Sequence, residues 1–131
     1  MFRKRVIIAD SSQSFLEGIR GLLETVFDSV VMVAEVSSLL DATERLSPDM
    51  VVIDLSLKAT DEVGAVTSIR RRYPDLKMIV LSRHDEPAAR RKALEAGADG
   101  FVLKREAASD LVPAVEAILR GGTYSSSVRS G

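Results

Sequence analysis

Four polar residues each follow an apolar run of this chain, and their side chains could act together. Asp10 follows the run VIIA, Asp54 follows VVI, Ser82 follows MIVL and Lys104 follows FVL. In an open parallel α/β sheet, binding sites form outside the carboxyl ends of the strands. We therefore expect two carboxylates, a hydroxyl and an ammonium at one edge of a sheet, although a single Asp at a strand end is more often a turn former or a helix cap.

The chemistry that suits this set is phosphoryl transfer. Hard carboxylate oxygens hold Mg²⁺, which keeps several waters and bridges to phosphate oxygens. A carboxylate such as Asp54 can act as a nucleophile and form an aspartyl phosphate. Lys104 would neutralise charge on the phosphoryl group, and Ser82 could hydrogen-bond one of its oxygens. Two other phosphate-binding patterns, G-x-x-x-x-G-K-[ST] and G-x-G-x-x-G, do not occur in the sequence.

The elements that must position these residues alternate along the chain. Short, near-continuous aliphatic runs are typical of strands covered on both faces, and they are separated by longer amphipathic segments. This pattern predicts repeated strand–helix units around a parallel sheet. The expected strands are Arg5–Asp10, Val30–Val36, Met50–Leu55, Lys77–Ser82 and Gly100–Lys104.

Five amphipathic segments predict helices. The clearest is a stripe of core residues formed by Phe15, Ile19, Leu22, Leu23 and Val26. The others are a helix capped by Ser38 and ending at Leu46, then Val63–Tyr73, then Pro87–Ala96 stopped by Gly97, and Asp110–Arg120 with Ser109 as N-cap and Pro113 in its first turn.

The composition limits the class of protein. A chain of 131 residues with 46% hydrophobic and 28% charged residues is expected to form one globular domain. A net charge of −1 gives no bulk attraction to nucleic acid or to anionic membranes, and the lack of cysteine excludes disulfides and thiolate metal sites. No stretch is long and apolar enough to span a bilayer, so we expect a cytoplasmic protein. Residues 1–122 are the expected domain, and 123–131 a flexible tail or the start of a linker.

Four segments of the sequence resemble successive blocks of response-regulator receiver domains. They are VIIADSSQSFLEGIRGLLE, PDMVVIDLSL, MIVLSRHDE and ALEAGADGFVLKR, and the resemblance covers about residues 4–122. The likeness is strongest to receivers of the LuxR-type class, whose output is a helix-turn-helix domain. It implies a doubly wound (βα)5 fold, with a five-stranded parallel sheet in the flavodoxin-like order 2-1-3-4-5 and helices on both faces.

The resemblance also implies roles for individual residues at the metal and the phosphoryl group. Asp54 matches the phosphoacceptor aspartate, and Asp10 matches the first acid of the pair that holds Mg²⁺. The backbone carbonyl of Ser56 matches the main-chain metal ligand. Lys104 matches the lysine that contacts the phosphoryl group.

Two further positions match the residues that switch between states in this family. Ser82 lies at the Ser/Thr that turns toward the phosphoryl group. Phe101 lies at the aromatic residue whose inward or outward rotamer accompanies activation.

Three departures from the family pattern bear on metal binding. The second acid after the first strand is replaced by Ser11, whose hydroxyl, alone or through a water, should hold Mg²⁺ more weakly than a carboxylate. The proline usual four residues after the acceptor is Lys58, whose ammonium could partly replace the cation. The usual loop glycine is Glu62, so a turn that needs positive φ is rebuilt here.

The leading hypothesis is a phosphorylation-driven switch. Its partner would be a sensor histidine kinase or a phosphotransfer protein, and it would catalyse its own phosphotransfer and dephosphorylation instead of turning over a separate substrate. Phosphorylation would change a homodimerisation or output surface, either around the fourth and fifth helices and fifth strand or on the first and fifth helices. DNA would be contacted only through an output domain that this chain does not contain.

Two alternatives stay open at this point. A pseudo-receiver that binds partners without phosphotransfer has its main support in Ser11, while the presence of Asp10, Asp54, Ser82 and Lys104 argues against it. A phosphatase of the haloacid-dehalogenase type requires a second Asp two residues after the nucleophile, where this chain has Ser56.

The basic runs and the single histidine have simpler interpretations. Arg70–Arg72 and Arg90–Lys92 lie on expected helices with acidic neighbours and are interpreted as solvated faces. His84 follows the fourth strand without metal-binding partners in sequence, and we expect a solvated loop residue close to the switch.

Overall fold

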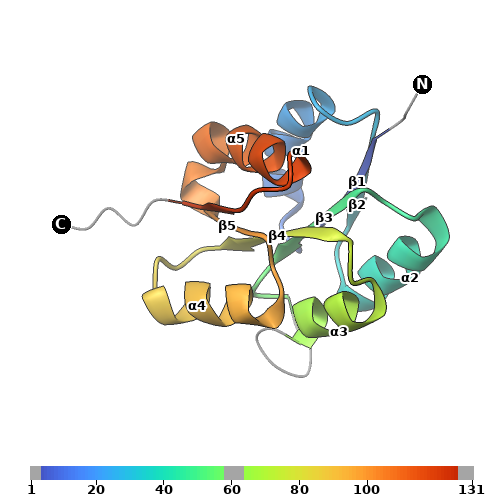
Figure 1. Ribbon diagram of the computed structural model, residues 1–131. Helices are drawn as coiled ribbons and strands as arrows, with labels where there is room; N and C mark the ends of the chain where they lie inside the picture. Colours follow the sequence, from blue (N-terminus) through green and yellow to red (C-terminus); the bar gives the residue numbers. More distant parts are fainter. Residues whose placement is uncertain (1–3, 58–63, 127–131) are drawn as a thin grey trace.

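A single parallel sheet forms the centre of the molecule (Figure 1). The computed structural model describes residues 4–57 and 64–126. Within them lie six strands in the order β2-β1-β3-β4-β5-β6, and every neighbouring pair is parallel. Their bounds are β1 Arg5–Ala9, β2 Ser29–Val33, β3 Met50–Asp54, β4 Lys77–Ser82, β5 Gly100–Leu103 and β6 Tyr124–Ser125. The order 2-1-3-4-5 is confirmed for the first five strands, and the sixth was not predicted.

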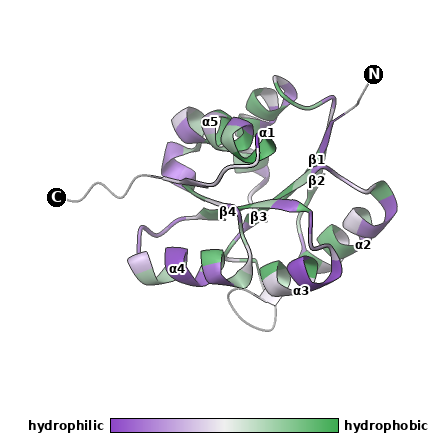
Figure 2. Ribbon diagram, viewed as in Figure 1, coloured by the Kyte–Doolittle hydropathy of each residue, from purple (hydrophilic) through white to green (hydrophobic). Residues whose placement is uncertain are grey.

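Helices cover both faces of the sheet, as expected. They are α1 Gln13–Glu24, α2 Val36–Leu46, α3 Gly64–Arg72, α4 Pro87–Ala96 and α5 Ala107–Leu119, and the 3₁₀ turn η1 Lys104–Glu106 precedes α5. The pair α1 and α5 covers one face, while α2, α3 and α4 cover the other (Figure 1). Polar residues colour the outer sides of these helices in Figure 2, because only the side toward the sheet is removed from water.

The central strands are buried on both faces. Residues of β1 alternate between the two layers, with Val6 and Ile8 in the cluster under α1 and α5, and Ile7 and Ala9 in the cluster under the other three helices. All five residues of β3 are buried as well. Two-sided burial explains why the strand sequences are continuously apolar instead of alternating.

The expected start of α2 is wrong. The helix begins at Val36 with Glu35 in the N-cap position, so Ser38 lies inside the helix and caps nothing. Its end at Leu46 is confirmed, because Ser47 takes the left-handed conformation at φ 47° and stops the helix before Pro48.

The expected start of α5 is also wrong. The chain turns directly from η1 into a helix at Ala107, three residues before the expected Asp110. Ser109 is therefore a helical residue, and its hydroxyl donates to the carbonyl of Glu106 at 3.1 Å. Pro113 falls in the helix interior instead of the first turn, on the exposed side, where its ring removes one backbone donor.

The predicted α4 is confirmed from Pro87 to Ala96. Gly97 ends it in the left-handed region at φ 119°, a conformation that side chains disfavour. A Cβ at Gly97 would also lie 2.7 Å from Cγ of Arg70, so this position is crowded as well as conformationally restricted.

Arg70 is not the solvated residue that we expected. Its guanidinium donates to the carbonyl of Gly97 at 2.7 and 3.1 Å and to the carbonyl of Pro74 at 2.6 Å. It also pairs with Asp99 at 2.9 Å, and Asp99 in turn accepts from the backbone N–H of Met78. Arg70 therefore connects the end of α3 to the turn between α4 and β5. Its neighbours Arg71 and Arg72 are exposed, as expected.

The serine-rich end contributes a short sixth strand to the sheet. Tyr124–Ser125 pair with Gly100–Phe101 as β6, and Ser126 is buried. The backbone N–H of Ser126 donates to the carbonyl of Phe101 at 2.7 Å, and its hydroxyl accepts from the N–H of Leu103 at 3.0 Å. Residues 124–126, predicted to belong to a flexible tail or the start of a linker, are hydrogen-bonded to β5 in this structure.

None of the helices within residues 4–57 and 64–126 combines the length and the apolar character that a membrane crossing requires.

Candidate functional site

The carboxyl ends of four strands bring the expected residues together. Asp54 is the last residue of β3 and Ser82 the last of β4, while Asp10 and Lys104 directly follow β1 and β5. The two aspartates are 0% and 1% exposed, and the ammonium-bearing side chain is 9% exposed. Parallel pairing of β1, β3, β4 and β5 puts all four at one edge of the sheet.

Lys104 lies between the two buried carboxylates. Its Nζ is 2.7 Å from Oδ2 of Asp10 and 3.5 Å from Oδ2 of Asp54. Oδ1 of Asp10 accepts a hydrogen bond from the backbone N–H of Ser12 at 2.8 Å. Apart from this ion pair with Lys104, the buried Oδ2 of Asp10 has no hydrogen-bond partner among the described residues.

Ser56 also binds the carboxylate of Asp54. Its backbone N–H donates to Oδ1 at 3.1 Å and its hydroxyl donates to Oδ2 at 2.9 Å. Only the backbone carbonyl of Ser56 was predicted to belong to the site, and this side-chain contact was not predicted. The signal was available, because Asp and Ser two residues apart after a strand often form local turns through their side chains.

The ring of Phe15 lies against the ammonium of Lys104. Nζ is 4.4 Å from the ring centroid, within the range of a cation–π contact. Phe15 was assigned to the core stripe of α1, but it is only partly buried, and the fully buried residues of α1 are Leu16, Ile19 and Leu23. Helical periodicity predicted the apolar stripe, but it could not show that Phe15 contacts the ammonium of Lys104.

The hydroxyl of Ser82 is bound to the loop that follows β4. It donates to the carbonyl of His84 at 3.0 Å and accepts from the N–H of the same residue at 3.1 Å. The side chain of His84 is exposed, as expected, and its backbone is the part that contacts the expected switch residue.

Phe101 points into the core in this structure. It is 1% exposed and packs in the cluster that contains Ala89 and Ala93 of α4. The expected switch aromatic is therefore in its inward position while the hydroxyl of Ser82 is engaged by the loop.

Two hollows adjoin the site and share Ser56. One, of about 540 Å³, is lined by Ser11, Ala34, Glu35, Val36, Ser37, Ser56 and Leu57. The other, of about 160 Å³, is lined by Leu55, Ser56, Ser82, Arg83, His84, Glu86 and Ala89. Ser11 is exposed at the rim of the site. The two other departures from the family pattern, Lys58 and Glu62, lie outside the described residues.

The donors at this edge fit a hard divalent cation. Asp10 and Asp54 supply buried carboxylate oxygens, and among the described residues Oδ2 of Asp10 has only the ammonium of Lys104 as a partner. Within residues 4–57 and 64–126 no group of three His, Cys, Asp or Glu side chains is placed to hold a metal. Two carboxylates, a backbone carbonyl and several waters suit Mg²⁺, which seldom uses an all-protein cage.

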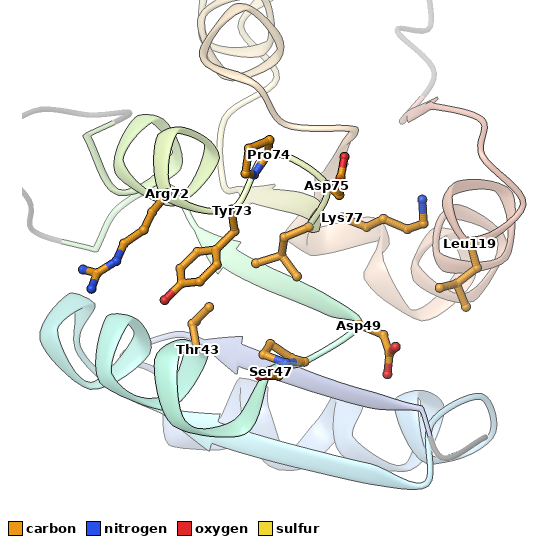
Figure 3. A pocket seen from close by; sticks show the side chains of 11 residues that line it. Thr43, Ser47, Asp49, Arg72, Tyr73, Pro74, Asp75, Lys77 and Leu119 are labelled. Atoms are coloured by element: carbon orange, nitrogen blue, oxygen red, sulfur yellow. The ribbon is translucent and has the colours of Figure 1, made fainter. Parts of the chain in front are cut away.

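A cavity at the opposite end of the sheet has no part in this cluster. It has a volume of about 540 Å³ and lies at the amino ends of β3 and β4, between the ends of α2 and α3 (Figure 3). Tyr73 lines it, and the hydroxyl of Tyr73 donates to the carboxylate of Glu44 at 2.7 Å. That hydrogen bond raises the pKa of Tyr73 from its ordinary value.

The sequence and the site geometry agree with one known family. The sequence model of the response regulator receiver domain matches residues 6–116. The chain belongs to this family. It is a receiver domain of the kind found in two-component response regulators.

Curated relatives of this receiver domain are transcriptional regulators. The transcriptional regulatory protein DegU of Brevibacillus brevis is 32% identical over 122 residues, which are 92% of this chain and 52% of DegU. The transcriptional regulatory protein PrrA of Mycobacterium tuberculosis is 35% identical over 126 residues, 94% of this chain and 54% of PrrA. The chain thus spans about half the length of these relatives.

Solved structures share the fold closely. The isolated REC domain of RcsB from Salmonella enterica serovar Typhimurium, determined with the phosphomimetic BeF₃⁻, superposes with a TM-score of 0.83 at 30% identity and covers 95% of this chain and 94% of that one. A LuxR-family response regulator from Aurantimonas gives a TM-score of 0.85 at 30% identity, covering 94% of this chain and 89% of that one.

Proposed function

We propose that this receiver domain accepts a phosphoryl group on Asp54 in a Mg²⁺-dependent reaction. The observation that carries the proposal is the buried pair of carboxylates, Asp10 and Asp54, with the ammonium of Lys104 2.7 and 3.5 Å from their oxygens. Burying two like charges is costly unless cations compensate them. A site that concentrates charge in this way is suited to bind a phosphoryl group and its metal.

Asp54 is the nucleophile in this proposal. A carboxylate oxygen forms the new bond to phosphorus while the bond from phosphorus to the donor, such as a phosphohistidine nitrogen, breaks and leaves its electron pair on the donor. Ser56 holds both oxygens of Asp54, which limits the orientations that the carboxylate can take. Such positioning is a large part of catalysis in phosphoryl transfer.

Asp10, Asp54 and the backbone carbonyl of Ser56 would hold Mg²⁺, and Ser11 would contribute a hydroxyl or a bound water. The ion would supply positive charge for the phosphoryl oxygens. Lys104 would then contact the phosphoryl group from the side of β5. Because Ser11 carries no charge, the site has two carboxylates instead of three. The single positive charge of Lys104 therefore offsets a larger fraction of the negative charge here than in a site with three carboxylates.

Ser82 and Phe101 would transmit the change. To reach a phosphoryl oxygen, the hydroxyl of Ser82 has to leave the backbone of His84, where it now makes two hydrogen bonds. The loop before α4 would then be free to rearrange, and Phe101 packs directly beneath that helix. The affected surface comprises α4, β5 and α5.

The partners of the switch follow from its class. A sensor histidine kinase or a phosphotransfer protein would donate the phosphoryl group, and transcription would be controlled through an output domain outside this chain. The edge of β5 is already paired with β6, so a second copy cannot add a strand there without displacing it. Dimerisation would use either the surface of α4, β5 and α5, without strand addition, or the face formed by α1 and α5.

A second candidate is a pseudo-receiver that binds partners without phosphotransfer. Two observations favour it: Lys104 already pairs with Asp10, and Ser11 adds no charge for a divalent ion. The choice between the two functions depends on whether Mg²⁺ can enter a site that holds an ammonium.

Intact-mass spectrometry tests the proposal directly. The protein is incubated with acetyl phosphate or phosphoramidate, with and without Mg²⁺. We expect one added phosphoryl group that requires Mg²⁺, disappears in Asp54→Asn and persists in Asp75→Asn, a matched change at an exposed position. A wild-type protein that gains no mass at high Mg²⁺ would overturn the proposal and favour the pseudo-receiver.

A further inference from the structure

We propose that Phe15 is a positioning residue for phosphotransfer, because its ring face holds the ammonium of Lys104 at the site. The inference rests on the proposed function of Asp54 and Lys104. The ring centroid lies 4.4 Å from Nζ, and the lysine side chain is 9% exposed. At this distance the negative face of the ring attracts the ammonium, and partial burial strengthens the attraction.

One short turn presents both the ring and a carboxylate to Lys104. The backbone N–H of Ser12 donates to Oδ1 of Asp10 at 2.8 Å, and the hydroxyl of Ser12 accepts from the N–H of Phe15 at 3.3 Å. Ser12 is the N-cap of α1, so the helix start and the orientation of Asp10 depend on the same residue. The segment from Asp10 to Phe15 therefore contacts the ammonium through a carboxylate and an aromatic face.

The chemistry explains why an aromatic ring suits this position. A third carboxylate would hold Lys104 more strongly but would add another like charge beside Asp10 and Asp54. A ring carries no formal charge and has no oxygen that could bind Mg²⁺. It also cannot accept the hydrogen bonds that the site would donate to a phosphoryl group. It also keeps water from one side of the ammonium. Phe15 thus stabilises Lys104 near the carboxylates while leaving it free to turn toward a phosphoryl oxygen.

A purely packing role for Phe15 makes a different prediction. The ring also contacts the cluster under α1 and α5, so truncation would disturb packing whatever its effect on Lys104. Ring fluorination separates the two roles, because fluorine withdraws electron density from the ring face with little change in shape. A packing role responds weakly to fluorine, whereas a cation–π contact weakens with each fluorine added.

The experiment replaces Phe15 by phenylalanines with one, two and three ring fluorines and measures the rate of Mg²⁺-dependent phosphorylation by acetyl phosphate. We expect a stepwise fall, reaching about three- to tenfold across the series. The same substitutions at Phe27, a buried ring on the same face of the sheet, should leave the rate unchanged. A rate that is equal for all Phe15 analogues would overturn the positioning role.

Nuclear magnetic resonance supplies a readout that does not need phosphorylation. The ε-methylene protons of Lys104 should be shifted upfield by the ring current of Phe15, and Phe15→Leu should remove that shift. The shift should persist in Asp54→Asn. Unshifted Lys104 protons in the wild-type protein would overturn the inference.

The two proposals fail in distinguishable ways. A wild-type protein that takes no phosphoryl group overturns the assigned role of Asp54, whatever the spectra show. A protein that is phosphorylated normally with every fluorinated ring overturns the role of Phe15 alone.

Discussion

At the scale of single residues, the site holds more negative than positive side chains among the described residues. Two carboxylates are buried, and within the described residues Lys104 is the cation whose ion pairs reach them both. Removing one member of such a cluster costs more than the removed contact, because the remaining charge stays buried without compensation. Ser11 is the position where one more carboxylate would most directly change the balance between negative side chains and bound cations.

Replacing Ser11 by Asp is expected to strengthen Mg²⁺ binding by about tenfold, because a third carboxylate oxygen adds formal charge for a hard cation. The phosphorylation rate at low Mg²⁺ should rise with it. Isothermal titration with MgCl₂ measures the affinity, and the rise in melting temperature with added Mg²⁺ checks it by linkage.

The control for this change is Ser68→Asp, which adds the same charge at an exposed position on α3. Equal gains from Ser11→Asp and Ser68→Asp would show that net charge, and not the site, controls Mg²⁺ affinity.

At the scale of elements, two contacts join segments that the alternating strand–helix pattern leaves separate. Ser126 joins β6 to β5, and its hydroxyl also donates to Asp110 of α5 at 3.0 Å. Arg70 joins α3 to the turn after α4. Both contacts stabilise the part of the molecule around β5, the strand that carries Phe101 and leads into Lys104.

Ser126→Ala should lower the free energy of unfolding by about 1–3 kcal/mol, because the buried N–H of Leu103 loses its acceptor. Urea unfolding measures the loss, and hydrogen exchange should show faster exchange at Leu103. The neighbouring Ser125 is exposed, so Ser125→Ala should stay within about 0.5 kcal/mol. Equal effects of the two changes would contradict the structural role of Ser126.

Arg70→Ala should also destabilise the protein by about 1–3 kcal/mol, since it removes charge-assisted hydrogen bonds to Gly97, Pro74 and Asp99. Arg71→Ala is the matched control on the same helix, where the side chain is exposed. Chemical denaturation of both variants decides the point. A loss in Arg71→Ala as large as that in Arg70→Ala would refute the assignment of Arg70 as the connecting residue.

At the scale of the whole molecule, the doubly wound sheet separates two ends with different character. The carboxyl ends of the strands gather the buried charges, while the amino ends carry the cavity lined by Tyr73 (Figure 3). The chain has two tyrosines, and both have a raised pKa. The hydrogen bond to Glu44 is the main cause for Tyr73, and burial is the main cause for Tyr124.

The stability of the whole domain should therefore fall at alkaline pH. A raised pKa means that the folded state binds the phenolic proton more tightly than the unfolded chain, whose value is 10.0. The resulting stabilisation is fully present below that pH and is lost as the pH rises through the folded pKa values. Urea midpoints measured across this range should decline less steeply in Tyr73→Phe and Tyr124→Phe. Phenols that titrate at 10.0 in the folded protein, followed by phenolate absorbance, would contradict this.

Much of the fold could be predicted from local pattern. Strand β4 and helix α4 were predicted residue for residue, because an uninterrupted aliphatic run and a Pro-to-Gly helix segment each have one favoured interpretation. The starts of α2 and α5 were predicted wrongly from Ser38 and Ser109. Serine is a common N-cap, but its hydroxyl also forms hydrogen bonds to nearby backbone groups elsewhere in a helix. The short β6 has too few residues for any periodicity to reveal it.

The position of Asp10, Asp54, Ser82 and Lys104 at one edge of the sheet could be predicted from the residues alone. A polar residue that ends an apolar run marks the end of a strand, and parallel strands bring their carboxyl ends together. The partners of these groups became visible only in the folded chain: Lys104 contacts Asp10 and Phe15, and Ser82 binds the backbone of the next loop. Partner choice depends on distances of a few ångströms between segments far apart in the chain, and side-chain packing sets those distances where periodicity and residue type do not.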